Sequence, residues 1–268
     1  MKKVITLFSI ELLKLKNQRF PIFSLLFIII FTIVVALFRT KLSSVEIFNM
    51  GKATGWQILS FAASWALQIA SLLILILSIN IVADEFSDRT IKNILTRQVS
   101  RFQFLFGKIV TIGFIVLVFL SAIFIVGALM GAIKGSMGNL EERGYIISTW
   151  TSLLSNHFLA FIFSFITIFT LGIFGAFIAM LIPKPGVAIG LTICLYFIFN
   201  IISQFANVRN FLFTSFTYFP INTAKEISHG LASSWTPGIY WCLLTNLGTG
   251  IIFLFLAKYI LKRKDILA

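Results

Sequence analysis

The chain has 268 residues, of which 59% are hydrophobic and 12% are charged, and its mean hydropathy is +1.00. A soluble domain carries roughly 25% charged residues, so this composition excludes an ordinary water-soluble globule and predicts an all-α polytopic membrane protein. The net charge of +13 would suit nucleic acid only on a water-exposed basic face, for which the chain has no polar domain. We therefore expect no nucleic-acid partner, and we expect the positive charge to set the topology and to contact membrane lipids.

Residues 1–18 predict an amphipathic helix at the membrane surface. Apolar side chains recur at helical spacing between Val4 and Leu15, and lysines flank them. A signal peptide is the competing interpretation, but the apolar run at residues 20–38 is long and no A-x-A-like cleavage site follows it. We expect this run to be the first span, because its length covers roughly 28 Å at 1.5 Å per residue.

Six apolar segments are long enough to cross a bilayer. They lie at about residues 20–38, 57–82, 109–133, 153–182, 187–203 and 239–260. Between the fourth and fifth, Pro183 and Pro185 oppose helix continuation and Gly186 permits a tight reversal. Six spans put both termini on one side, and 15 of the 22 Lys and Arg residues fall on that side. The positive-inside rule therefore predicts a multi-pass protein of the cell (plasma) membrane with both termini in the cytoplasm.

Ionisable side chains are sparse in the six predicted spans. Inside these segments we find no Asp, Glu, Lys or Arg except Lys258, near the cytoplasmic end of the last. Proton- or ion-coupled carriers usually need such groups, so a secondary transporter is not expected. His157 and His229 are the only histidines, and each fits a structural or interfacial role better than a catalytic one. We expect no catalytic residue.

Cofactor and nucleotide motifs are also missing from the sequence. Cys194 and Cys242 lie inside apolar runs and have neither metal-site nor disulfide-framework spacing. Gly51-Lys52 and Gly107-Lys108 lack the upstream glycine and the following Ser or Thr of a P-loop. We expect no metal and no cofactor, and any ATP that drives this protein is expected to be hydrolysed by another polypeptide.

Residues 84–106 form a charge-dense segment between the second and third spans, expected in the cytoplasm. Two acid-before-base pairs four residues apart, Glu85 with Arg89 and Asp88 with Lys92, support a helix. Ser100 and Gln103 match a capping box, which predicts that a second helix starts there and leads into the third span. By spacing alone, a solvated loop that obeys the positive-inside rule is an equally good interpretation.

This segment resembles the signature of ABC-2-type ABC transporter permeases. In that family an acidic pair, a threonine, an apolar pair, a P-[VI]-S-R element and a GK pair precede the third span. Gln98 stands where the family usually has proline, and Arg89 stands where glycine is common. The matching residues are Asp84-Glu85, Thr90, Ile94-Leu95, Val99-Ser100-Arg101 and Gly107-Lys108.

The resemblance implies the transmembrane permease subunit of an ATP-driven exporter. It implies that the segment docks as a coupling helix on a separate ATP-binding cassette ATPase subunit, and that a second permease subunit, identical or related, completes the transporter. The substrate class implied is amphipathic: a peptide, a peptide antibiotic or a lipid. The residues expected to couple to the ATPase are Glu85, Arg89, Thr90, Lys92, Arg97 and Arg101.

Residues 204–238 are expected to be an extracellular segment rich in aromatic residues. In ABC-2-type exporters the corresponding connection forms re-entrant helices, so the resemblance implies an extracellular gate here; an aromatic belt at the headgroups is the alternative. Asn222-Thr223 is expected to precede a short helix that Gly230 ends. The candidate gate residues are Phe211, Phe213, Phe216, Tyr218 and Phe219.

Gly127 and Gly131, with Gly135, recur every four residues in the third span. This small-xxx-small spacing predicts close helix packing, either inside one bundle or at a dimer interface.

Two other classes of function remain open from the sequence. One is a membrane sensor or scaffold that binds a partner without transport, and the other is a membrane-embedded enzyme. Co-purification with an ATPase would favour the exporter over the scaffold, whereas turnover that survives loss of the ATPase would favour the enzyme.

Overall fold

The computed structural model describes residues 2–43, 53–87, 100–142 and 145–263. Within them, six helices are long and apolar enough to cross a membrane, which confirms an all-α polytopic membrane protein. Each overlaps one of the apolar segments expected from the sequence. The helices are α2 (Arg19–Ser43), α3 (Gly55–Ser87), α5 (Arg101–Lys134), α6 (Trp150–Leu181), α7 (Pro185–Ile202) and α10 (Gly238–Arg263).

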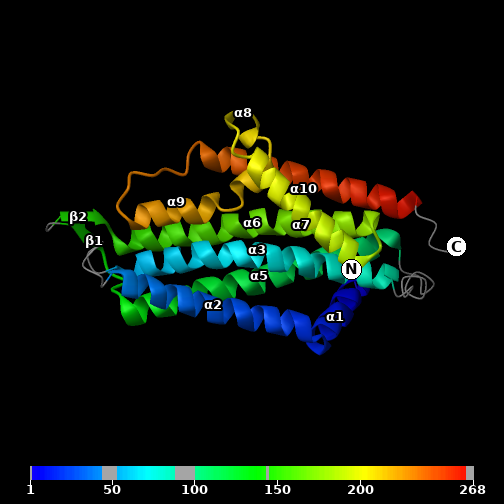
Figure 1. Ribbon diagram of the computed structural model, residues 1–268, viewed down its shortest axis with the longest axis horizontal. Helices are drawn as coiled ribbons and strands as arrows, with labels where there is room; N and C mark the ends of the chain where they lie inside the picture. Colours follow the sequence, from blue (N-terminus) through cyan, green and yellow to red (C-terminus); the bar gives the residue numbers. More distant parts are fainter. Residues whose placement is uncertain (1, 44–52, 88–99, 143–144, 264–268) are drawn as a thin grey trace.

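The long helices run along one axis of the molecule (Figure 1). Helix α1 (Lys2–Asn17) lies at an angle to them, at the same end of the bundle as the last turn of α10. We call this the terminal end. The opposite end carries the short antiparallel strands β1 (Leu140–Glu142) and β2 (Tyr145–Ser148), and we call it the hairpin end.

Helix α3 lies at the centre of the bundle and packs against α2, α5, α6 and α7. Two thirds (67%) of its most apolar window is buried, compared with 22% for α2 and for α10. Its buried face contains Ala62, Ala63, Ala66 and Ala70. Small side chains let neighbouring helices approach closely, which matters in lipid because apolar burial alone does not drive helix association there.

Gly127 and Gly131 pack α5 against α3 within one chain. A Cβ on Gly131 would collide with the carbonyl oxygen of Gly55 at the start of α3, and a Cβ on Gly127 would lie 3.6 Å from the carbonyl oxygen of Leu59. The spacing seen in the sequence is therefore used inside this bundle.

The helix break between α6 and α7 lies at the expected prolines. Helix α6 ends at Leu181, and α7 begins with Pro185 in its first turn, where the missing N–H of proline costs no helical hydrogen bond. Gly186 is already inside α7, so its predicted role in the reversal is wrong. Residues 182–184 make the turn instead, in extended and irregular backbone.

The connection between α7 and α10 lies against the bundle rather than beyond its end (Figure 1). It contains α8 (Ala206–Arg209), the 3-10 helix η2 (Phe213–Phe216) and α9 (Phe219–Ser228), and α9 packs on α3 and α6. Helix α9 starts three residues before Asn222, so the predicted start at Asn222-Thr223 is wrong; Pro220 occupies its first turn instead. Gly230 follows its end with φ 76°, as expected for a terminating glycine.

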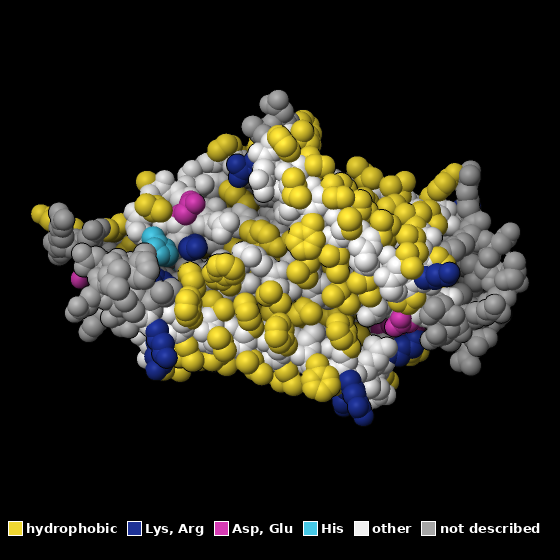
Figure 2. All heavy atoms as spheres, in the orientation of Figure 1, with side chains coloured by type: hydrophobic (Ala, Val, Ile, Leu, Met, Phe, Trp, Pro, Cys, Tyr) yellow, Lys and Arg dark blue, Asp and Glu magenta, His cyan; other side chains and the backbone are white. Residues whose placement is uncertain are grey.

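The face shown in Figure 2 is covered by hydrophobic side chains over the middle of the bundle, and most of its Lys and Arg side chains lie toward the two ends. A charge at mid-bilayer costs at least about 2.5–3.5 kcal/mol, so this distribution suits a protein whose middle lies in lipid.

Candidate functional site

Four charged side chains from three helices meet at the terminal end of the bundle. Glu11 and Lys14 come from α1, Glu85 from the last turn of α3, and Lys108 from the second turn of α5. The Lys108 Nζ lies 3.0 Å from Glu11 Oε2 and 2.8 Å from Glu85 Oε1, and the Lys14 Nζ lies 2.6 Å from Glu85 Oε1 and 3.3 Å from Glu11 Oε1. We call these four residues the charge cluster. Two cations and two anions make it neutral in sum.

Lys108 is the most enclosed member of the charge cluster. Its side chain is 2% exposed, and its Nζ also donates a hydrogen bond of 2.8 Å to the carbonyl oxygen of Ile81. An ammonium group has three N–H donors, and the two carboxylates and this carbonyl account for all three. A buried charge is tolerated when it is paired and hydrogen-bonded in this way, so Lys108 fixes α5 to both α1 and α3.

Lys14 closes the charge cluster on its outer side, with 43% of its side chain exposed. Partial burial acts to lower the pKa of Lys14, but the hydrogen bond and the negative charge of Glu85, together with Glu11, outweigh it and raise the pKa above its ordinary value. Lys14 is therefore protonated, and the cluster intact, throughout the neutral pH range.

Helix α1 is attached by apolar contacts as well as by charge. The ring of Phe8 meets the ring of Phe114 edge-on, with centroids 5.7 Å apart. A Cβ on Gly107 would lie 3.3 Å from the Cβ of Leu7, so the absence of a side chain at Gly107 lets α1 approach α5. The amphipathic helix expected at the membrane surface is thus packed against the bundle.

Two of the predicted coupling residues lie in the described part of the chain. Glu85 belongs to the charge cluster. The Nη1 of Arg101 donates hydrogen bonds of 2.6 and 2.9 Å to the carbonyl oxygens of Leu261 and Lys262, in the last turn of α10. The other four predicted coupling residues, Arg89, Thr90, Lys92 and Arg97, lie outside the described residues, as does most of the predicted coupling helix.

The capping box predicted at the start of α5 is confirmed. Ser100 Oγ accepts a hydrogen bond from the Gln103 N–H, and Gln103 Oε1 accepts one from the Ser100 N–H. Residues 88–99 therefore lie between two fixed points: Glu85 before them and the capped start of α5 after them.

The candidate gate residues divide into two groups. Phe213 and Phe216 are buried, and the ring of Phe213 packs against those of Phe174, Phe199 and Phe253 from three spans. Phe219 contacts Phe216 and Trp235 through ring edges. Phe211 is 70% exposed and touches Trp241. Phe213, Phe216 and Phe219 thus pack the α7–α10 connection onto the bundle, whereas Phe211 points away from its core.

Tyr218 joins this connection to the centre of the bundle. Its hydroxyl lies 3.1 Å from Ser71 Oγ on α3 and is also hydrogen-bonded to the hydroxyl of Tyr196 on α7. Burial, followed by the neighbouring Tyr196, raises the pKa of Tyr218 well above its ordinary value. Tyr218 is therefore a neutral hydrogen-bonding group and not an acid or base at physiological pH.

Buried hydroxyl groups line the contact between α6 and the same connection. Thr167 Oγ1 donates to the carbonyl oxygens of Ser164 and, at 3.5 Å, Thr217. The hydroxyls of Ser164, Thr214 and Thr217 are buried and have no hydrogen-bond partner among the described residues. An unsatisfied buried polar group costs about 1–3 kcal/mol, so this region retains hydrogen-bonding capacity that the bundle itself does not use.

The charge cluster was only partly visible in the sequence. Glu85 was predicted to couple to the ATPase and to pair with Arg89 along one helix, and Glu11, Lys14 and Lys108 were not connected to it. One signal was present: Glu11 falls on the apolar face of its helix, three residues after Phe8 and four before Leu15. A carboxylate on a face that packs inward requires a cation.

The described residues contain no group of three or more His, Cys, Asp or Glu side chains able to hold a metal ion. No curated protein matches the chain in sequence. Residues 25–267 match the family described as "Protein of unknown function (DUF2705)", and this match includes Glu85 and Lys108 but begins after Glu11 and Lys14. Because the match covers most of the chain, the protein belongs to the DUF2705 family.

Proposed function

We propose that this protein is the membrane subunit of an ATP-driven exporter, and that residues 88–99 dock on a separate ATP-binding subunit in the cytoplasm. The observation that supports this proposal most strongly is the charge cluster. It holds the end of α3 through Glu85 and the second turn of α5 through Lys108, on either side of residues 88–99 in the chain. A segment fixed at both ends transmits displacement into the helices that hold it.

Arg101 supports the same proposal from the other side of the bundle. It lies two positions after residues 88–99 in the chain and donates to the carbonyl oxygens at the end of α10. Displacement of residues 88–99 would therefore reach α1 and α3 through the charge cluster and α10 through Arg101. A solvated loop that only obeys the positive-inside rule needs neither connection.

The α7–α10 connection fits the role of a closure at the opposite side of the membrane. Gln57 Nε2 donates to the Ser228 carbonyl oxygen at 3.2 Å, and the hydroxyls of Ser60 and Ser228 lie 3.0 Å apart. Helix α9 is thereby attached to α3, the helix that also carries Glu85. An amphipathic substrate is favoured because the contact between α6 and the α7–α10 connection combines buried apolar side chains with the hydroxyls of Ser164, Thr214 and Thr217, which have no partner among the described residues.

The docking test compares a charge reversal inside residues 88–99 with one outside them. Tagged full-length chain is purified from native membranes, and the nucleotide-binding protein that co-purifies is identified by its ATPase activity. We expect Arg97→Glu to reduce co-purification at least tenfold. Lys184→Glu, in the exposed turn between α6 and α7, should leave it unchanged. A wild-type chain that purifies with no ATPase, or an Arg97→Glu variant that retains it, would refute the docking proposal.

The transport test separates an exporter from a scaffold. In proteoliposomes that contain the chain and its ATPase, an amphipathic substrate should stimulate ATP hydrolysis and should be moved in an ATP-dependent way. An ATPase that binds normally but is never stimulated, with no movement across a panel of peptides and lipids, would instead identify a scaffold or sensor subunit.

The orientation has its own test. After Cys194 and Cys242 are replaced by serine, a cysteine at His229, exposed near the hairpin end, should react with an impermeant thiol reagent on intact cells. A cysteine at Lys184, exposed in the α6–α7 turn at the terminal end, should react only after lysis. The reverse pattern would place the termini outside.

A further inference from the structure

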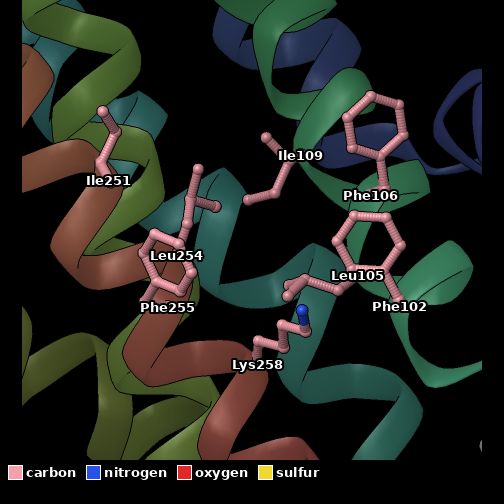
Figure 3. A pocket seen from close by; sticks show the side chains of 8 residues that line it. All are labelled: Phe102, Leu105, Phe106, Ile109, Ile251, Leu254, Phe255 and Lys258. Atoms are coloured by element: carbon pink, nitrogen blue, oxygen red, sulfur yellow. The ribbon is translucent and has the colours of Figure 1, made fainter.

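A groove opens on the outer surface of the bundle between the first turns of α5 and the last turns of α10 (Figure 3). Its volume is about 430 Å³, within the roughly 300–1,000 Å³ typical of ligand pockets. Phe102, Phe106 and Ile109 form the α5 wall, and the α10 wall faces them across the gap. The full lining is Phe102, Leu105, Phe106, Ile109, Ile251, Leu254, Phe255 and Lys258.

The groove is apolar along its length and has one charged group at one end. From Ile251 to Lys258 the α10 wall rises about 10 Å at 1.5 Å per residue. The rings of Phe102 and Phe106 are stacked with centroids 6.1 Å apart and give the other wall a continuous apolar surface. Leu105 and Ile109 are almost fully buried beneath it. The shape and chemistry suit an extended hydrocarbon chain.

Lys258 marks the end of the groove nearest the terminal end of the bundle. Its Nζ lies 5.2 Å from the centroid of the Phe102 ring, and it has no carboxylate partner among the described residues. One turn further, Lys262 is exposed. A cationic mouth on an apolar groove is complementary to a molecule that has an anionic head and a hydrocarbon tail.

We propose that the groove binds an anionic phospholipid, with one acyl chain between α5 and α10 and the phosphate at Lys258. An entirely apolar helix seated in the groove would remove the Lys258 ammonium from water without supplying an anion, and a buried unpaired charge is costly. An anionic lipid supplies the anion and the apolar chain together. The site is separate from the charge cluster and does not depend on the proposed transport function.

The experiment measures lipid binding to the purified full-length chain in detergent by native mass spectrometry, with phosphatidylglycerol and phosphatidylcholine that have identical acyl chains. One basic side chain near a membrane surface contributes about fivefold in anionic-lipid affinity, so the wild type should prefer phosphatidylglycerol by about fivefold. Lys258→Gln should abolish this preference. Lys184→Gln, an exposed lysine at the same end of the bundle outside the groove, should retain it.

The proposal that an acyl chain lies in the groove is tested by filling the groove with a larger side chain. Ile251→Trp should weaken binding of both lipids, whereas Ile252→Trp, on the adjacent exposed position outside the lining, should weaken neither. The proposal is wrong if Lys258→Gln keeps the preference, if Lys184→Gln loses it equally, or if the two tryptophan variants behave alike. A dimer that Ile251→Trp dissociates without any change in lipid binding would assign the groove to a second copy of the chain and would also overturn the proposal.

Discussion

Replacing Lys108 with methionine tests the charge cluster most directly. Methionine is unbranched and adaptable and fills much of the same space, but it lacks the ammonium that contacts Glu11, Glu85 and the Ile81 carbonyl. Removing one partner of a buried ion pair costs about 3–5 kcal/mol, because the other charge stays buried. The side chains of Glu11 and Glu85 are 9% and 6% exposed, and the remaining cation, Lys14, is 43% exposed. We therefore expect a loss within that range.

Thermal unfolding of the purified full chain measures this loss. A chain of this length shifts in Tm by roughly 2–4 °C per kcal/mol, so the Tm of Lys108→Met should fall by on the order of 10 °C. The matched control is Lys184→Met, because Lys184 is exposed in the α6–α7 turn. A surface substitution of this kind stays within about 0.5 kcal/mol of the wild type.

A charge-balanced double variant distinguishes electrostatic pairing from lost packing. Glu11→Gln combined with Lys108→Met leaves Lys14 and Glu85 as one opposite pair at 2.6 Å. It should therefore be more stable than Lys108→Met alone. The reasoning is refuted if Lys108→Met unfolds at the same temperature as Lys184→Met, or if the two losses simply add in the double variant.

Four further predictions follow from single contacts. Gly131→Ala should lower stability by about 1–3 kcal/mol, because its Cβ would meet a rigid backbone carbonyl of α3; thermal unfolding measures it, with Gly138→Ala, which has open space, as the control. Ser100→Ala should lower the free energy of unfolding by about 1 kcal/mol through loss of the capping box. A smaller loss of stability than that of Gly138→Ala would contradict the stabilising role of this capping box. Thr217→Val should keep or raise stability, because it removes a buried hydroxyl without a partner among the described residues, yet it should reduce transport if that hydroxyl meets the substrate. The raised pKa of Lys14 means that its stabilising contribution is complete at neutral pH and disappears only as the pH rises past the ordinary lysine pKa of about 10.4; a Tm that falls between pH 7 and 9 would contradict this.

The spans were predictable because the bilayer imposes their length and composition on the sequence itself. The start of α5 was predictable for a local reason: Ser100 and Gln103 are three residues apart, so their reciprocal hydrogen bonds need no tertiary information. The break before α7 was equally local, since Pro185 constrains its own backbone. The role assigned to Gly186 was wrong because residues 182–184 already complete the turn.

The charge cluster was not predictable in the same way. Lys14 and Glu85 are 71 positions apart, and no periodicity links two helices that meet only after the bundle has formed. The docking of α9 depends likewise on contacts such as that between Gln57 and Ser228, 171 positions apart. Glu11 was the residue that sequence reasoning had most reason to notice, because a carboxylate on an apolar helix face implies a cation from elsewhere in the fold.

The charge cluster also determines which helices move together. Separating α1 from the bundle breaks both the Lys14–Glu85 and the Lys108–Glu11 pairs and leaves Lys108 buried with one carboxylate fewer. Because unpaired buried charges are costly, α1, α3 and the start of α5 are expected to move as one body. Helix α10 is joined to α5 at this end by the Arg101 hydrogen bonds, and the groove between the two helices lies beside them. If residues 88–99 dock on an ATP-binding subunit as proposed, force applied to them would change the spacing of α5 and α10 before it separated α1 from α3, and occupancy of the groove would respond to that subunit.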